Sequence, residues 1–388
     1  MVMRILDLQL QSAFDWIQMR TTFVTHILLL ALTCLTAVGE PSRKNYRDIT
    51  EDTRLVGICY STWFNPVVRK GKPIYDIRTI LSKNPNEPQW GPKHAFHFWA
   101  EPALGYYRSD DEAVIRQHMT WLADAKIDFL VLDNTNMTLS WNGAHAEQMV
   151  YQPFSTLLNT LLAMHKEGKA TPHVVIWCYK SVLPDMKKRY FDQPAYQDLW
   201  LYWNEGQGSK PLVLIRDSLD TESRRHFTVR KMWGLQKSLA EREWSFLQPH
   251  PQKVGKQNAH VEHLSVSTAL QRSYMTASDA IGRQGGRTFQ RQWQRAFEIQ
   301  PKFVTITWWN EWIAQRLVRN GQTAFVDNYT PEFSRDIEPM KGGHGNRYYQ
   351  FMKSYIDAYK KGQSLPSGLL EATEVKQDAL PDVGKPRR

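Results

Sequence analysis

The chain has 388 residues, of which 42% are hydrophobic and 12% aromatic. A chain of this length can bury a large core without disulfide bonds, and single α/β barrels reach this size. The formal net charge is +10, yet we find no DNA-binding motif and no RNA-binding signature. Scattered surface charge is the simplest interpretation of the basic balance, and an acidic glycan partner is the alternative.

The N-terminal segment has the features of an export signal. From Met19 the chain places Arg20 before an apolar run, residues 23–38, which ends in the small-x-small pattern Ala37-Val38-Gly39. This pattern predicts a signal peptide whose removal leaves Glu40 first, with residues 1–18 an over-extended start. The run is too short for a stable membrane span. We therefore expect a secreted or periplasmic protein, the alternative being a cytosolic protein with an unusual apolar leader.

Short β-prone runs alternate with amphipathic helices from about residue 54. Such alternation predicts a parallel sheet covered by helices, which at this length favours a single-domain (β/α)8 TIM barrel. The predicted strands are Leu55–Tyr60, Ala95–Trp99, Phe129–Asp133, Val174–Tyr179, Leu199–Trp203, Leu212–Ile215, Phe227–Met232, Leu264–Ser267 and Phe303–Trp308. The barrel domain is expected at 40–363, after the 1–39 leader and before a loose tail at 364–388.

The helices between these runs begin and end at recognisable signals. Ser109-Asp-Asp-Glu112 has the spacing of a capping box, and Pro153 opens a second helix that Gly168 ends. A third apolar stripe begins at Phe289 and stops before Pro301. Cys34 lies in the leader, and we expect Cys59 and Cys178, each inside a predicted strand, to be buried thiols rather than a disulfide.

Polar residues at the carboxyl ends of the predicted strands are the first candidates for a site, because parallel barrels carry their chemistry there. Asp133 and Asn134 follow the apolar run FLVL, although an Asx turn would also explain Asp133. His97 and Glu101 follow the second predicted strand. Glu205, Glu262 and His263 are weaker candidates because they lie in a turn or before a strand.

The segment TITWWNEWIAQR, residues 305–316, places Glu311 among three tryptophans. Regular alternation would point Thr305 and Thr307 into the barrel together with Trp309. Burial of a carboxylate against indoles costs free energy unless partners or function offset it. Aromatic rings beside carboxylates suit a sugar, and a structural ion pair with Arg316 is the alternative.

We find no cofactor or metal motif. The pairs His94-x-x-His97 and His260-x-x-His263 lack the context of a zinc site, and GxGxxG, GxxxxGK[ST] and GxSxG are all missing. The prediction is therefore no cofactor and no metal.

Several segments together resemble glycoside hydrolase family 99 and its relatives. They are GYYRSDDEAVIRQH from Gly105, AKIDFLVLD from Ala125, the Trp309-Asn-Glu-Trp312 motif, Ile337-Glu-Pro339 and Tyr348-Tyr349. The resemblance spans roughly residues 55–360. It implies a (β/α)8 barrel acting on α-linked mannose or glucose, with Glu311 as the base on the sugar 2-hydroxyl. The second glutamate of the family motif is replaced by Ala314, and residues 315–336 form an insertion.

The sequence thus predicts an exported glycoside hydrolase that cleaves a poly- or oligosaccharide, with Glu311 as the main catalytic carboxylate and Asp133 or Glu101 as the second. Glu338 is a weaker stand-in. Desolvation alone would make Glu311 an acid rather than a base, so the mechanism stays open. Predicted substrate-binding residues are His97, Trp99, Tyr106, Tyr107, Asn134, Trp308, Trp309, Asn310, Trp312 and Glu338. The alternatives are a degenerate glycan-binding barrel, suggested by Ala314, and a polysaccharide lyase or assembly-associated domain.

Overall fold

The computed structural model describes residue 49 and residues 53–137, 146–206, 208–271, 280–319, 321–326 and 330–370. These residues fall within one compact unit that spans 47–388. The predicted leader and most of the predicted C-terminal tail lie outside the described residues.

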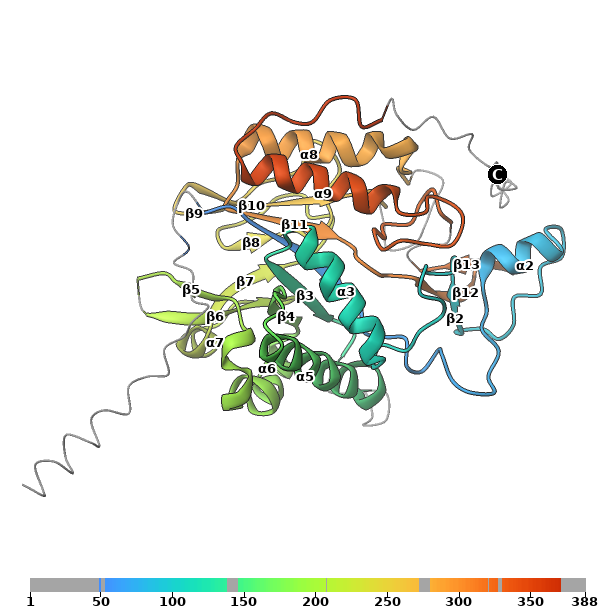
Figure 1. Cartoon of the computed structure of the whole chain (residues 1–388), viewed down its shortest axis with the longest axis horizontal. Helices are drawn as coiled ribbons and strands as arrows, with labels where there is room; N and C mark the ends of the chain where they lie inside the picture. Colours follow the sequence, from blue (N-terminus) through green and yellow to red (C-terminus); the bar gives the residue numbers. More distant parts are fainter. Residues whose placement is uncertain are drawn as a thin grey trace, which may run out of the picture. The chain divides into compact units, whose positions relative to one another are not determined.

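A mostly closed, barrel-like sheet of parallel strands forms the centre of the unit (Figure 1). Strand β1 lies between β11 and β3, and the order then continues through β4, β6 and β7 to β8, while β10 pairs with β11. The strands are β1 Leu55–Tyr60, β3 Phe129–Asn134, β4 His173–Cys178, β6 Ser209–Ile215, β7 Thr228–Met232, β8 Glu243–Trp244, β10 His260–Ser267 and β11 Phe303–Thr307.

The ring closes indirectly between β8 and β10. Strand β9 (Gly255–Gln257) pairs antiparallel with β10, and an isolated bridge joins Lys256 to Glu241, just before β8. The segments 233–242 and 245–254, on either side of β8, contain no helix. The regular strand–helix alternation expected from the sequence therefore fails on this side of the barrel.

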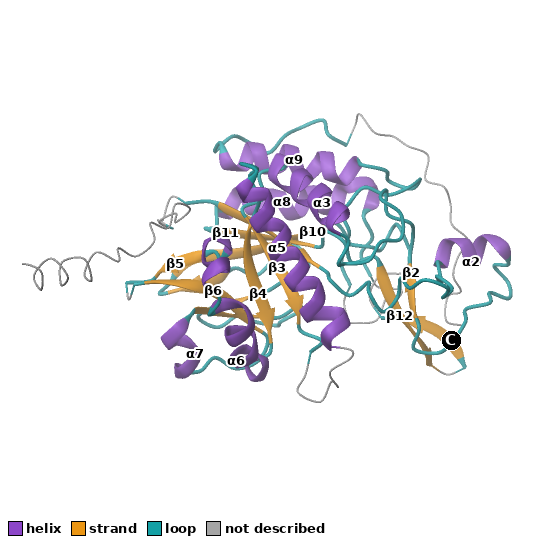
Figure 2. Cartoon of the chain, turned by 60° about the horizontal axis from the view of Figure 1, so that its bottom comes forward, coloured by secondary structure: helices purple, strands orange, loops and turns teal. Residues whose placement is uncertain are grey.

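Helices cover the outer face of the barrel, except on the side of β8 (Figures 1 and 2). The longer ones are α3 (Glu112–Asp124), α5 (Gln152–Lys166), α8 (Arg287–Ile299) and α9 (Arg347–Lys360). The shorter helices and helical turns are η1 (Glu147–Tyr151), η2 (Lys180–Val182), α6 (Leu183–Met186), η3 (Lys187–Phe191), η4 (Pro194–Leu199), α7 (Thr221–His226) and η5 (Gln284–Gly286). Helices α8 and α9 lie side by side, where the rings of Phe289 and Tyr355 meet at 5.6 Å.

The predicted starts of the helices are close to those observed, with one correction. The N-cap of α3 is Asp111, whose side chain accepts from the backbone N–H groups of Ala113 and Val114. Ser109 instead accepts from the backbone N–H of Phe64 and anchors the preceding loop. A carboxylate next to the first turn is a good cap because it satisfies two N–H groups and the helix dipole together.

One predicted strand lies outside the barrel, and another joins the barrel sheet only as a short antiparallel branch. The segment at 95–99 forms β2 (Phe96–Phe98), which pairs with β12 (Ile313–Arg319) in a small outer sheet completed by β13 (Gln322–Phe325). The segment at 199–203 contributes β5 (Tyr202–Asn204), which is antiparallel to β6. Short helix α2 (Ile77–Lys83) lies beside the outer sheet (Figure 1). Sequence alternation cannot show which strand is the neighbour, and the two-residue strand β8 was too short to predict.

The barrel interior is filled by large apolar side chains. The interior cluster includes Phe129, Trp177, Trp244, Phe303 and Trp308. Gly57 makes room for one of them, since a Cβ at this position would lie 2.2 Å from the ring of Phe129. Both described cysteines are free and buried, as the sequence predicted.

Candidate active site

Glu311 lies in the loop after β11 and is 4% exposed. Its Oε2 accepts a hydrogen bond from Arg335 Nη2 at 2.5 Å, and Arg335 Nη1 donates to Gln271 Oε1 at 2.7 Å. Gln271 follows β10, so two adjacent strand ends and the 330–338 segment meet at this ion pair. Arg316, the partner considered from sequence, contacts Thr323 instead.

Asp133 lies at the end of β3, the strand that pairs with β1. Both Asp133 and Glu311 affect the thiol of Cys59 in β1. Burial raises the pKa of this thiol well above the usual value, and the negative charges of the two carboxylates raise it further. The charge of Arg335 lowers the same pKa. Asp133 Oδ1 also accepts the Thr135 N–H at 2.8 Å, so the Asx turn considered from sequence is present too.

Asp336 is a third acidic side chain beside Glu311, and sequence analysis did not select it. Its Oδ2 accepts from Trp99 Nε1 at 2.7 Å, and the Glu311 backbone N–H also donates to this carboxyl. Oδ1 is buried and has no hydrogen-bond partner. Burial raises the Asp336 pKa to about 7, against the lowering effect of Arg283 and Arg335. The feature of the sequence that points to Asp336 is its position directly before Ile337-Glu-Pro339, at the end of the 315–336 insertion.

Glu338 lies in a closed hydrogen-bond network with no exposed surface. Its Oε2 accepts from Tyr107 Oη at 2.6 Å and Trp312 Nε1 at 2.5 Å, and its Oε1 lies 3.0 Å from His118 Nε2. The other His118 nitrogen lies 2.9 Å from Tyr60 Oη. This geometry makes Glu338 and Tyr107 anchors that join the segment after β11 to helix α3.

Asn310 and Asn134 also hold neighbouring segments. Asn310 accepts from the Ser61 N–H at 2.8 Å and donates to the Ser61 carbonyl at 3.1 Å, which fixes the loop after β1. Asn134 Nδ2 lies 3.6 Å from the sulfur of Met186 in α6. Because side chains alternate along β3, Asn134 points to the helical layer while Asp133 points inward.

The four predicted tryptophans are buried rather than displayed. Trp99 stacks on Trp312 with centroids 4.7 Å apart, and both are 0% exposed. Trp308 packs inside the barrel, against Trp177 at 6.4 Å. Trp309 packs outside, against Trp121 at 6.2 Å. These indole faces are occupied by protein, so in this conformation they offer no platform on which a sugar could stack.

The inward side chains near the end of β11 agree with the predicted alternation only as far as Thr307. Thr305 Oγ1 lies 2.8 Å from His263 Nε2, and Thr307 donates to the Phe246 carbonyl, so both threonines face the interior. The positions of Trp308 and Trp309 are the reverse of those expected. The strand ends at Thr307, and the two-residue alternation does not continue beyond it.

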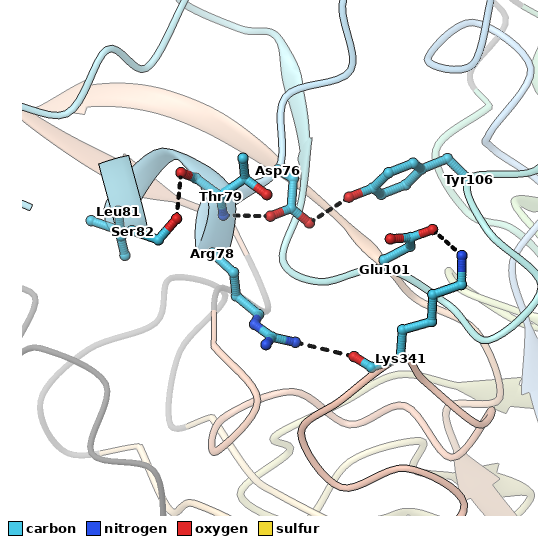
Figure 3. A pocket seen from close by; sticks show the side chains of 8 residues that line it. All are labelled: Asp76, Arg78, Thr79, Leu81, Ser82, Glu101, Tyr106 and Lys341. Carbon is cyan, nitrogen blue, oxygen red and sulfur yellow. Dashed lines mark hydrogen bonds and ion pairs between the residues drawn. The ribbon is translucent and has the colours of Figure 1, made fainter. Parts of the chain in front are cut away.

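Glu101, Tyr106 and His97 lie with the small outer sheet. Glu101 pairs with Lys341, and Tyr106 Oη donates to Asp76 at 3.0 Å, on the wall of a surface cavity of about 370 Å³ (Figure 3). His97 contacts the carbonyls of Trp90 and Ala95, and burial lowers its pKa. The prediction that Glu101 follows a barrel strand is wrong, because β2 pairs with β12 outside the barrel.

The weaker candidates form an ion-pair cluster of their own. Arg230 of β7 is 0% exposed and bonds Glu262 at 2.5 Å and Glu205 at 2.5 Å. His263 stacks on Trp244 with centroids 4.4 Å apart, and burial lowers its pKa to about 3. In this part of the barrel interior the charges are mutually satisfied.

No group of three or more histidine, cysteine or acidic side chains in the described segments could hold a metal ion. None of the helices in those segments is long and apolar enough to cross a membrane.

Comparison with known proteins finds similarity to solved structures. The GH99 endo-α-mannosidase of Bacteroides thetaiotaomicron aligns with a TM-score of 0.47 and 16% identity, over 80% of this chain and 98% of that one. Its complex with bis-tris propane aligns with a TM-score of 0.45 and 16% identity, over 79% and 98%. A GH138 enzyme targeting pectin rhamnogalacturonan II aligns with a TM-score of 0.32 and 12% identity, over 81% of this chain and 39% of that enzyme.

No family model matches the chain. No curated protein matches it either.

Proposed function

We propose that this protein is a glycoside hydrolase built on a (β/α)8-type barrel, with Glu311 as its main catalytic carboxylate. The observations that carry the proposal are the Glu311–Arg335 ion pair after β11, the hydrogen bond from the Glu311 backbone to Asp336, and the place of Asp133 at the end of the nearby parallel strand β3. Glycoside cleavage needs one carboxyl that donates a proton and one that acts as base or nucleophile. Neighbouring carboxyls in unlike environments supply these two roles.

The environments favour different roles for Glu311 and Asp336. The guanidinium of Arg335 stabilises the ionised form of Glu311, which suits a base or nucleophile. Asp336 has a pKa of about 7 because it is buried, so near neutral pH a large share of it carries a proton to donate. In the proposed reaction Asp336 protonates the glycosidic oxygen as its bond to the anomeric carbon breaks. That carbon bonds either to water that Glu311 deprotonates, or to Glu311 itself, which water then displaces. Asp133 is the remaining carboxylate at the site.

This assignment also supplies an acid in place of the second glutamate of the family motif, which this chain lacks. Ala314 lies within β12, opposite His97 of β2. Asp336 reaches Glu311 from a different segment, which the 315–336 insertion delivers to the site. The proposed acid is therefore supplied by the part of the chain that departs from the family pattern.

A glycan-binding barrel without catalysis is the second candidate. It is favoured by the ion pair of Glu311 with Arg335, because a satisfied buried carboxylate can be purely structural. The two candidates differ in whether the chain turns over a glycan, so one digestion experiment separates them.

The test is digestion of a glycan panel by residues 40–388, with the products read by mass spectrometry. For an enzyme, Glu311→Gln should reduce turnover at least ~10²-fold, the usual scale for one acid–base group, while glycan binding persists. Glu222→Gln, at an exposed glutamate of α7, is the matched control and should keep full activity. Binding without products from the unmodified protein would favour the non-catalytic barrel, and unsaturated products absorbing in the ultraviolet would indicate a lyase.

We further propose that the protein is exported and is secreted or periplasmic. The basis is the sequence pattern of Arg20 followed by the apolar run 23–38 and Ala37-Val38-Gly39.

A further inference from the structure

Three side chains outside the carboxylate group meet on neighbouring strand ends of the same barrel mouth. Tyr179 follows β4, Arg216 follows β6, and Trp233 follows β7, and these strands are adjacent in the order β4-β6-β7. All three strands run parallel to β11, whose end leads to Glu311. We call Tyr179, Arg216 and Trp233 the arginine subsite.

The guanidinium of Arg216 is held by both aromatic rings. Its central carbon lies 3.9 Å from the ring centroid of Trp233 and 4.7 Å from that of Tyr179. The backbone N–H of Arg216 donates to the Cys178 carbonyl at 2.9 Å, which fixes the chain at the base of the side chain. Stacking uses the faces of a guanidinium and leaves its edge, with the N–H donors, for another partner.

That edge has no acceptor within the described part of the chain. No hydrogen bond or ion pair links the Arg216 side chain to another described residue, whereas Arg230, Arg283 and Arg335 each bond to protein oxygens. Asp217 is next in sequence, but its Oδ1 accepts the Lys180 N–H at 2.9 Å. The Arg216 side chain is partly exposed, so a solute can reach it.

Aromatic contacts connect the arginine subsite to the carboxylates. Trp233 lies 5.9 Å from Trp177, and Trp177 lies 6.4 Å from Trp308 in the interior cluster that also contains Cys59. Cys59 is the thiol whose pKa responds to Asp133 and Glu311. Three successive rings, those of Trp233, Trp177 and Trp308, therefore lie between the Arg216 cation and the proposed catalytic group.

We propose that the arginine subsite binds an anionic group, a carboxylate or a sulfate, on a sugar of the glycan bound at this barrel mouth. The planar edge of a guanidinium matches such groups with two parallel N–H···O bonds. This inference rests on the proposed function and narrows its substrate class to acidic glycans.

The experiment measures binding in the Glu311→Gln background, so that turnover does not interfere. The probes are short oligogalacturonides with their carboxyl-reduced forms, and short carrageenan oligosaccharides with their desulfated forms. Binding is followed by calorimetry and by tryptophan fluorescence. The added variants are Arg216→Gln, Arg216→Lys and the control Arg225→Gln, an exposed arginine of α7.

Without a change at Arg216, at least one acidic probe should bind ~10-fold or more tightly than its neutral form. Arg216→Gln should abolish this preference without changing the affinity for the neutral form, and Arg225→Gln should keep it. Arg216→Lys should restore only part of it, because an ammonium cannot make the paired contact. The probe whose preference depends on Arg216 identifies the carboxylate or the sulfate as the ligand group.

Equal binding of acidic and neutral probes, or a preference that Arg216→Gln leaves intact, would overturn the inference, and Arg216 would then be a packing residue. The proposed function has a separate outcome. Hydrolysis of neutral glycans that is indifferent to Arg216 would retain the hydrolase and remove the subsite. An Arg216-dependent preference without any hydrolysis would retain the subsite and remove the catalytic role.

Discussion

Glu338 tests whether a sequence-predicted site residue is an anchor or a catalyst. Its carboxylate is 0% exposed and meets Tyr107, Trp312 and His118. Glu338→Gln keeps the shape but replaces charge-assisted hydrogen bonds with neutral ones. Hydrogen bonds to a charged group contribute about 1 kcal/mol more than neutral ones, so three of them give a loss of about 3 kcal/mol. This is an upper value, because a neutral amide is less costly to bury.

The predicted loss converts to a change in melting temperature. An unfolding entropy of about 2 cal/mol/K per residue, over the roughly 300 residues that the structure describes, gives a fall of about 5 °C for 3 kcal/mol. Glu338→Ala should be worse, since it leaves three buried donors unpaired at about 1–3 kcal/mol each and also opens a cavity. We expect that variant to accumulate poorly as folded protein.

The assay is calorimetric melting of the unmodified protein, Glu338→Gln and the exposed control Glu222→Gln, with glycan turnover measured on the folded fraction of each. An anchor predicts a lowered melting temperature for Glu338→Gln and nearly full specific activity. If Glu338→Gln melts like the unmodified protein and loses activity at least ~10²-fold, the anchor argument is wrong and Glu338 is a catalytic carboxyl.

Two further predictions concern pH and export. Asp336 keeps its proton to a pKa of about 7 when folded, against 3.8 ordinarily, so its contribution to stability should be full below about pH 4 and lost as pH rises towards 7. Asp336→Asn should therefore gain stability relative to the unmodified protein between about pH 5 and pH 8, by up to ~4 kcal/mol; an unchanged difference in melting temperature would contradict this. Expressed with its leader in a secreting host, the protein should be cleaved next to Gly39, as read by N-terminal sequencing. Intact Met19 on soluble cytosolic protein would refute the export proposal.

Local signals in the sequence were sufficient for much of the secondary structure. The β-prone runs at 55–60, 129–133 and 303–308 fall on β1, β3 and β11 with small shifts at their ends. Pro153 lies in the first turn of α5, and Gly168 follows its end. Such features depend on residues within one or two turns of each other, so periodicity and capping chemistry reveal them.

The pairing of strands with one another could not be predicted from such local signals. The segment at 95–99 has the composition of a barrel strand, yet β2 pairs with β12, more than two hundred residues later in the chain. A strand's own sequence describes which of its faces are apolar and carries little information about its neighbour. That single pairing places Glu101 beside the outer sheet, where it pairs with Lys341.

The sequence by itself determined that Glu311 is an unusual carboxylate at the end of a barrel strand, and that Asp133 ends another. Only the tertiary structure decided its partner, Arg335, and added Asp336 to the group. It also decided that Glu338 bonds His118, 220 positions away. The physical reason is that burying a charge is tolerable only with a partner, and the partner is chosen by the geometry of the closed sheet rather than by nearness in sequence.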